Sequence, residues 1–110
     1  MNGTFSTDST VNATPLRLDS ALSAQIQVLG DALRAKGWSV SSAESCTGGG
    51  IAFAFTSVSG SSDWFNQSWV TYSNSAKQSR LGVTEQTLVE YGAVSQQTVK
   101  EMADGVRRNS

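Results

Sequence analysis

The chain has 110 residues, and its eight basic and nine acidic side chains give a formal net charge of −1. A hydrophobic content of 38% is ordinary for a globular protein, and the length suits one domain. The basic residues are scattered, which argues against a nucleic-acid partner. We expect no membrane partner, because the longest apolar run, Ile51 to Phe55, is too short to cross a bilayer and the N-terminus has no signal-peptide pattern.

The sequence contains no histidine and one cysteine, Cys46. The absence of histidine excludes catalysis by Ser-His-Asp or Cys-His groups and removes the commonest metal ligand. A single cysteine excludes an internal disulfide and a zinc site made of thiolates, and it fits a reducing, cytoplasmic setting. If the protein is an enzyme, its base must be a lysine, a carboxylate or a tyrosine.

Residues 1–15 are rich in Ser, Thr and Asn and predict a flexible N-terminal tail, followed by one domain over 16–110. The domain begins with a helix that Asp19 or Ser20 can cap and that Gly37 can end. Its apolar residues recur at spacings of three and four, which predicts a face directed toward the core: Leu18, Leu22, Ile26, Leu29 and Leu33, widened by Ala21, Val28 and Ala32.

The remaining elements follow from alternation, turn residues and caps. We expect strands at 38–42 and 64–72, a turn at 59–62, and helices from about 50 to Ser57, from Ser73 or Asn74 to Leu81, from Thr84 to Tyr91 and from Ser95 to about Arg107. The last two helices each begin with a hydrophobic staple around the cap, made by Val83 with Leu88 and by Val94 with Val99.

This count of five helices and two strands predicts an α/β fold that is incomplete. A sheet of two strands is marginal without more strands or good helix cover. The last helix has an apolar face of Val99, Met102, Ala103 and Val106, and no strand follows it in the sequence. We therefore expect the domain to be part of a larger one or to be completed by a partner.

The most informative stretch is the loop from Ala43 to Gly50, between the first strand and the second helix. A glycine-rich helix start presents backbone N–H groups and partial positive charge, which suit a phosphate or an oxyanion. Ser45 is a candidate nucleophile there, although such serines are more often caps. Cys46 is a weaker candidate, since free cysteines usually serve as small buried apolar groups. The glycines match neither a P-loop nor a dinucleotide-binding pattern.

Tyr72 and Lys77 lie on either side of the corner between the second strand and the next helix, where both could face one site. The ordinary alternative is a half-buried aromatic ring and a solvated lysine. If Lys77 is desolvated, the neutral amine is favoured and could accept the proton of Ser45. Without histidine, a Ser-Lys pair is the main way to activate a serine.

Several motifs in fixed order resemble the CinA C-terminal domain family. They are Ala43-Glu44-Ser45-Cys46-Thr47-Gly48-Gly49, Gly60-Ser61-Ser62 with Trp64-Phe65, Val70-Thr71-Tyr72-Ser73-Asn74 with Ala76-Lys77, Leu81-Gly82-Val83 and Tyr91-Gly92-Ala93-Val94-Ser95, followed by Met102-Ala103. The resemblance runs from about Leu18 to Arg108.

The resemblance implies a three-layer α/β/α sandwich around a mostly parallel sheet. It also implies a nicotinamide-nucleotide amidohydrolase, which converts nicotinamide mononucleotide to nicotinic acid mononucleotide and ammonia in pyridine nucleotide recycling, without metal or other cofactor. On that basis Ser45 is the nucleophile, with Tyr72 and Lys77 as further catalytic residues, and N–H groups near Thr47 and Gly48 hold the oxyanion. The expected substrate contacts are Glu44, Cys46, Thr47, Gly48, Gly49 and Asn74.

The family's domains extend beyond the last motif found here, with another strand, a second glycine-rich loop, further strands and a late arginine. Three functions therefore remain open. The chain is an amidohydrolase that needs the rest of the domain, a nucleotide-binding remnant without catalysis, or an interaction protein whose exposed sheet edge recruits another subunit. A homo-oligomer is compatible with each of them.

Overall fold

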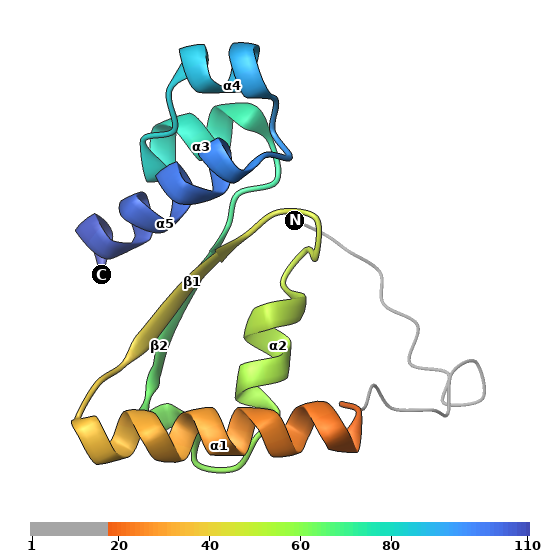
Figure 1. Cartoon of the computed structure of the whole chain (residues 1–110), viewed down its shortest axis with the longest axis vertical. Coiled ribbons are helices and arrows are strands. Elements are labelled where there is room, and N and C mark those ends of the chain that lie inside the picture. Colours follow the sequence, from red (N-terminus) through yellow and green to blue (C-terminus); the bar gives the residue numbers. More distant parts are fainter. Residues whose placement is uncertain (1–17) are drawn as a thin grey trace, which may run out of the picture.

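The computed structural model describes residues 18–110, so the predicted tail lies outside the described residues. The helices are α1 (Ser20–Lys36), α2 (Gly50–Thr56), α3 (Asn74–Leu81), α4 (Glu85–Tyr91) and α5 (Gln96–Asn109), with a short 3₁₀ helix at Ser61–Asp63, and the strands are β1 (Val40–Glu44) and β2 (Phe65–Val70) (Figure 1). The prediction of an α/β fold with five helices and two strands is confirmed for this part of the chain.

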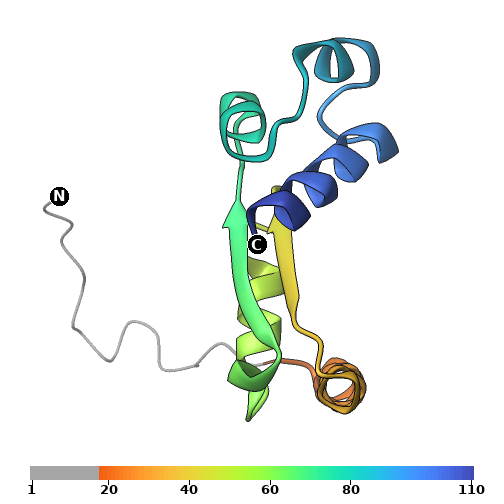
Figure 2. The same cartoon turned by 90° about the vertical axis from the view of Figure 1, so that its left-hand side faces the viewer.

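The two strands pair in parallel, with Glu44 opposite Val70 at their carboxyl ends. The pairing shifts register between Val40 and Ser41 and is regular from there onward. Helix α5 lies against one face of this sheet and α2 lies on the other, so the layers follow the order helix, sheet, helix (Figures 1 and 2). Because both strands end at the same edge, the residues that follow Glu44 and Val70 are brought close together.

The first strand lies two residues later than the sequence predicts. The N–H groups of Gly37 and Trp38 donate to the carbonyls of Arg34 and Leu33 at 3.1 and 2.9 Å, which closes the end of α1. Trp38 therefore belongs to the helix cap, and its ring lies 4.9 Å from the ammonium of Lys36. At the other end the strand continues to Glu44, whose carbonyl accepts from the N–H of Thr71 at 3.0 Å.

The second strand is shorter at both ends than the predicted 64–72. The 3₁₀ helix occupies part of the predicted turn, and Trp64 caps its end by donating its N–H to the carbonyl of Ser61 at 3.1 Å. Beyond Val70, the carbonyls of Thr71 and Tyr72 leave the sheet and accept hydrogen bonds from the side chain of Lys77. Local capping and the lysine thus set the limits of the strand.

The helix caps follow the sequence closely. Of the two predicted alternatives at each start, Asp19 caps α1 and Ser73 caps α3. Thr84 and Ser95 cap α4 and α5 as predicted, each accepting a hydrogen bond from the N–H three residues later at 3.1 Å. Gly37 ends α1 in the left-handed conformation that favours glycine.

Two apolar clusters hold the elements together. One contains Ile26, Ala54, Val58 and Trp64; the other contains Leu81, Val83, Leu88, Met102 and Val106. Each depends on a helix glycine that permits close approach. A side chain at Gly30 would meet the indole of Trp64, and one at Gly105 would collide with the backbone of Leu81.

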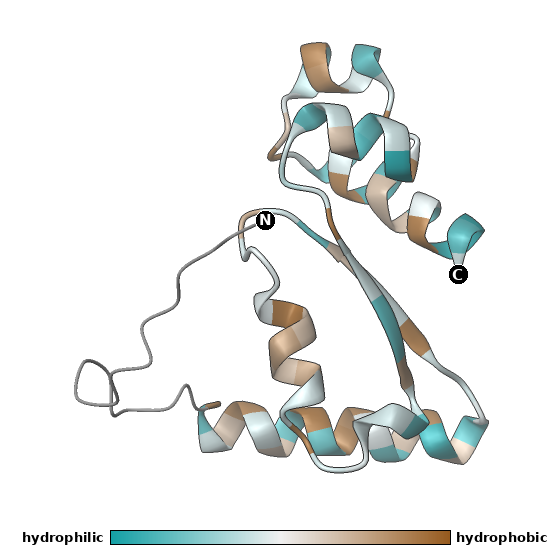
Figure 3. Cartoon of the chain, turned by 180° about the vertical axis from the view of Figure 1, so that it is seen from behind, coloured by the Kyte–Doolittle hydropathy of each residue, from teal (hydrophilic) through white to brown (hydrophobic). Residues whose placement is uncertain are grey.

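Less of the predicted apolar surface is buried than the spacing suggests. In α1, Ile26 is buried, whereas Leu22 and Leu29 are 41% and 38% exposed. Hydrophobic and hydrophilic bands alternate along that helix (Figure 3). The staple partners Val83 and Leu88 are buried in one cluster, but Val94 and Val99 both remain exposed. No helix within residues 18–110 is long and apolar enough to cross a membrane.

Candidate active site

Ser45 and Lys77 meet at the edge where both strands end. Ser45 directly follows β1, and the cap on α3 by Ser73 begins the helix so that Lys77 lies in its first turn. The Lys77 Nζ atom lies 3.0 Å from Ser45 Oγ, 2.9 Å from the Thr71 carbonyl and 2.8 Å from the Tyr72 carbonyl. The lysine is 2% exposed, so its amine is enclosed by these three oxygens.

The number of oxygen neighbours matches the hydrogen-bonding capacity of the Lys77 amine. As an ammonium, Lys77 has three N–H groups for its three oxygen neighbours. As a neutral amine, it donates two to the carbonyls, and its lone pair is left for the hydroxyl of Ser45. In both forms, every N–H group of the amine has an oxygen acceptor among these three neighbours. Among residues 18–110, no carboxylate forms an ion pair with this lysine.

Glu44 holds the loop between β1 and α2 in place through hydrogen bonds. Its carboxylate accepts from the N–H groups of Ile51 and Ala52 at 2.8 and 2.9 Å, and from the hydroxyls of Thr47 and Ser68. Burial raises the pKa of the carboxyl, but these four hydrogen bonds together outweigh burial and lower the pKa below its ordinary value. Glu44 is 4% exposed, and its hydrogen bonds brace the loop between β1 and α2.

The prediction that the start of α2 offers free N–H groups to an anion is wrong for Ile51 and Ala52. Both donate to Glu44, which supplies the negative charge from within the protein. The N–H of Gly48 is also occupied, because it donates to the carbonyl of Ser45 at 3.0 Å in a tight turn. Gly48 is therefore not available as an oxyanion donor in this conformation.

The other predicted site residues lie in the loop after Ser45 or near the start of α3. Gly48 and Gly49 have φ angles of 62° and 112°, which let the loop turn directly into α2. Cys46 is exposed next to Ser45, with its thiol free. Asn74 begins α3 and is exposed. The side chain of Tyr72 is 72% exposed, and among residues 18–110 its hydroxyl forms no hydrogen bond with the pair.

The sequence did not reveal two residues that form hydrogen bonds in the site. Thr71 provides a carbonyl to Lys77, and Ser68 provides a hydroxyl to Glu44. Thr71 could have been found from its position, because it lies between the end of a strand and the Ser73 cap, where a carbonyl is free of the sheet. Its own hydroxyl is buried and has no partner among the described residues.

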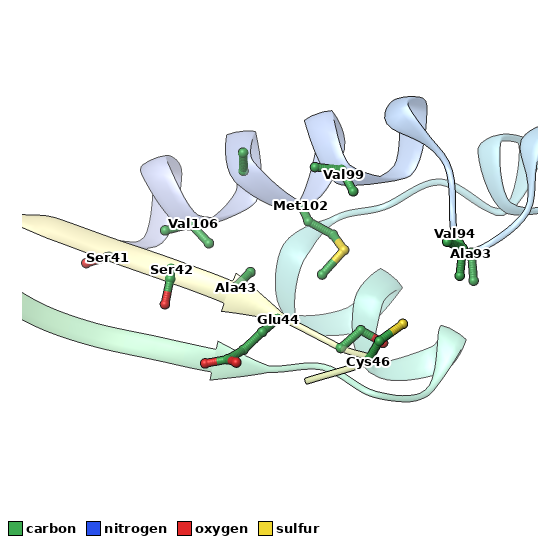
Figure 4. Close-up of a pocket in the computed structure, with 12 residues that line it drawn as sticks. Ser41, Ser42, Ala43, Glu44, Cys46, Ala93, Val94, Val99, Met102 and Val106 are labelled. Atoms are coloured by element: carbon green, nitrogen blue, oxygen red, sulfur yellow. The ribbon is translucent and has the colours of Figure 1, made fainter. Parts of the chain in front are cut away.

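A groove begins beside Ser45 and runs between β1 and α5. It encloses about 370 Å³ and has a mostly apolar lining from β1, the segment before α5, and α5 itself (Figure 4). Ser45 and Cys46 lie at its edge, and Met102 and Val106 form part of its wall. Within residues 18–110, no group of three or more His, Cys, Asp or Glu side chains could hold a metal ion.

The chain is similar to known proteins over most of its described length. Residues 22–110 match the model of the CinA C-terminal domain. The chain is 63% identical over 78 residues to a nicotinamide-nucleotide amidohydrolase PncC from Enterobacter agglomerans, covering 71% of this chain and 48% of that relative. The corresponding protein from Escherichia coli K12 is 51% identical over 87 residues, covering 79% and 53%.

Solved structures show the same similarity to CinA proteins. The competence/damage inducible protein CihA from Agrobacterium tumefaciens superposes with a TM-score of 0.83 at 40% identity, over 87% of this chain and 58% of that one. The chain thus spans about half the length of the curated relatives it matches. With the family model covering residues 22–110, the chain belongs to the CinA C-terminal domain family.

Proposed function

We propose that this chain carries the nucleophile and base of an amidohydrolase that acts on the carboxamide of nicotinamide mononucleotide. The observation that carries the proposal is the 3.0 Å contact between Ser45 Oγ and the enclosed amine of Lys77. Two relatives with 63% and 51% identity bear the name nicotinamide-nucleotide amidohydrolase. The loop that holds Ser45 is part of the matched region.

In the proposed reaction, Lys77 takes the hydroxyl proton of Ser45 as Oγ attacks the carboxamide carbon. The tetrahedral intermediate then loses ammonia, which receives the proton that Lys77 holds. Water, activated by the same amine, cleaves the acyl-enzyme and releases the carboxylate. One water is consumed for each carboxamide converted to a carboxylate and ammonia.

The remaining site residues have proposed roles that follow their positions. Tyr72 holds Lys77 through its backbone carbonyl, and we assign to its exposed hydroxyl the task of assisting the leaving group. We assign substrate contacts to Cys46, Thr47, Gly48 and Gly49 of the loop and to Asn74 at the start of α3; all of them except the half-buried Gly49 are exposed. Glu44 acts indirectly, by holding the loop that carries Ser45.

Two independent measurements test whether Ser45 is an activated nucleophile. One is ammonia release from nicotinamide mononucleotide by the chain, its Ser45→Ala variant and its Lys77→Met variant. The other is the rate at which a fluorophosphonate, a serine-directed reagent, labels the chain. We expect both signals to disappear in Ser45→Ala. In Lys77→Met we expect labelling to slow by about two orders of magnitude, the usual contribution of a positioned base.

Matched control variants distinguish the loss of the Ser-Lys pair from a general effect of replacing a serine or a lysine. Ser59 and Lys36 are exposed, so Ser59→Ala and Lys36→Met should leave the labelling rate unchanged. Far-UV circular dichroism checks that each variant is folded. Labelling that persists in Ser45→Ala, or that does not depend on Lys77, refutes the Ser-Lys mechanism. Labelling of Ser45 without ammonia release would retain the activated serine but reject this substrate for the chain on its own.

A further inference from the structure

Two serine side chains connect the strands just before the candidate active site. Ser42 on β1 and Ser68 on β2 lie opposite each other in the parallel pairing. The Ser42 hydroxyl donates to Ser68 Oγ at 2.9 Å, and the Ser68 hydroxyl donates to Glu44 Oε2 at 3.2 Å. Ser68 is thus bonded to two residues of β1, and these three side chains form a cross-strand link.

Polar side chains are unusual at this place in the fold. Strands of a parallel sheet that has helices on both faces are usually apolar. The side chains of Ser42 and Glu44 point away from α5, whereas Ala43 points toward it (Figure 4). Both serines of the link are half-buried, and a hydroxyl removed from water costs free energy unless it is hydrogen-bonded. Two apolar side chains would avoid this cost, which indicates that the hydroxyls serve a specific purpose.

That purpose follows from where the Ser-Lys pair is attached. Ser45 directly follows Glu44 at the end of β1, whereas Lys77 is held by the carbonyls of Thr71 and Tyr72 beyond β2. The nucleophile and the base thus belong to different strands, so the distance between them depends on how the strand ends are joined. The Thr71 N–H donates to the Glu44 carbonyl at 3.0 Å and joins the backbones there. The cross-strand link joins the side chains.

The link also reaches the loop that carries the nucleophile. The Glu44 oxygen that accepts from Ser68 also accepts from the N–H of Ala52 in α2. Ser68 therefore limits rotation of the carboxylate, and the carboxylate in turn holds the loop between β1 and α2. Without the Ser68 hydroxyl, Glu44 keeps its bonds to the loop and to α2 but loses its side-chain connection to β2.

We propose that Ser68 is a positioning residue that fixes the end of β2 against β1 and thereby keeps Lys77 in contact with Ser45. Within residues 18–110, Ser68 forms no hydrogen bond with either member of the pair, so it acts through Glu44 and Ser42. This inference rests on the Ser-Lys pair of the proposed function but not on its substrate. A misplacement of 1 Å between reacting groups can cost about a hundredfold in rate, so we expect the smaller shift caused by losing Ser68 to cost about tenfold.

The first measurement is the rate at which a fluorophosphonate labels Ser45. Ser68→Ala removes the hydroxyl and should slow labelling about tenfold, whereas Ser68→Thr keeps the hydroxyl and should retain most of the parent rate. The matched control is Ser61→Ala, because Ser61 is also half-buried and its hydroxyl forms no hydrogen bond among residues 18–110. Labelling is measured without denaturant, where the chain is folded, so a loss of stability alone does not slow it.

The second measurement does not require Ser45 to react. The Thr71 amide donates across the strand ends, so its hydrogen exchange reports how firmly they are joined. We expect faster exchange at Thr71 in Ser68→Ala, and exchange like that of the parent chain in Ser68→Thr and Ser61→Ala.

The two measurements separate this inference from the proposed function. A parent chain that is not labelled at Ser45 contradicts the Ser-Lys mechanism, and exchange at Thr71 then decides whether Ser68 fixes the strand ends. Labelling of Ser68→Ala at the parent rate overturns the inference, and so does unchanged exchange at Thr71. A loss that Ser68→Thr shares with Ser68→Ala also overturns it, because the threonine variant keeps the hydroxyl.

Discussion

Replacing Glu44 with glutamine tests whether this carboxylate braces the loop that carries Ser45. The substitution keeps the size and shape of the side chain and removes its charge. One oxygen of Glu44 serves Thr47 and Ile51, and the other serves Ala52 and Ser68. Whichever way the amide is turned, its NH₂ group faces a backbone N–H at the start of α2. One of those two donors must then lose its acceptor.

The size of the effect follows from these contacts. A buried donor left without a partner costs about 1–3 kcal/mol, and the remaining bonds weaken because the acceptor is no longer charged. The smaller desolvation cost of the neutral amide offsets part of this loss. We expect the free energy of unfolding to fall by about 2 kcal/mol at pH 7. Urea denaturation followed by tryptophan fluorescence measures it.

The effect should also depend on pH with a definite sign. The pKa of Glu44 is lower in the folded state than its ordinary value of 4.5. A lowered pKa stabilises the fold above the unfolded-state value, and this contribution disappears as the pH falls through the folded-state value. The difference between the parent chain and Glu44→Gln should therefore be full at pH 7 and shrink as the pH falls below about 4.5.

The control for this series is Glu90→Gln, since Glu90 is exposed on α4 and the change should have little effect at any pH. A glutamine variant as stable as the parent chain would refute the bracing role. So would a loss of stability that stays the same from pH 7 to pH 4, because it would not arise from the charge of the carboxylate.

Three further predictions concern packing and capping, each read from urea denaturation unless stated. Thr71→Val removes a buried hydroxyl that has no partner among the described residues, so it should raise the free energy of unfolding by about 1 kcal/mol; a loss of stability would mean that the hydroxyl has a partner in solution. Gly105→Ala should cost about 1–3 kcal/mol, because the added methyl group collides with the Leu81 backbone, and unchanged stability would show that α5 can move away from α3. Ser95→Ala removes the cap of α5 and should cost about 1 kcal/mol, which a melting temperature 4–8 °C lower would report and an unchanged one would contradict.

Local signals in the sequence predicted most element types and helix ends. Thr84 and Ser95 cap their helices because a hydroxyl reaches an N–H three residues later, whatever surrounds it. The strand limits were predicted less well, since they depend on partners elsewhere in the chain. Trp38 lies outside the first strand because its N–H donates to the end of α1. Tyr72 lies outside the second strand because its carbonyl accepts from Lys77.

The sequence predicted the contact between two residues of the candidate site, but not the contacts that Glu44 forms. Ser45 and Lys77 were singled out from residue type and from the family resemblance, and the structure brings them into contact across 32 positions. The inward turn of Glu44 was not foreseen. The motif shows a carboxylate beside a serine, and only the position of α2 over the strand end reveals which N–H groups it meets.

The sequence by itself determined the family, the order of helices and strands, and the exclusion of histidine chemistry. These are set by residue identity and by spacings within one or two turns of the chain. Tertiary structure decided that Lys77 is enclosed at the end of the sheet and that α2 receives its negative charge from Glu44. Each of these depends on parallel strand pairing and helix packing, which join groups far apart in the sequence and decide which polar atoms are satisfied and which remain free.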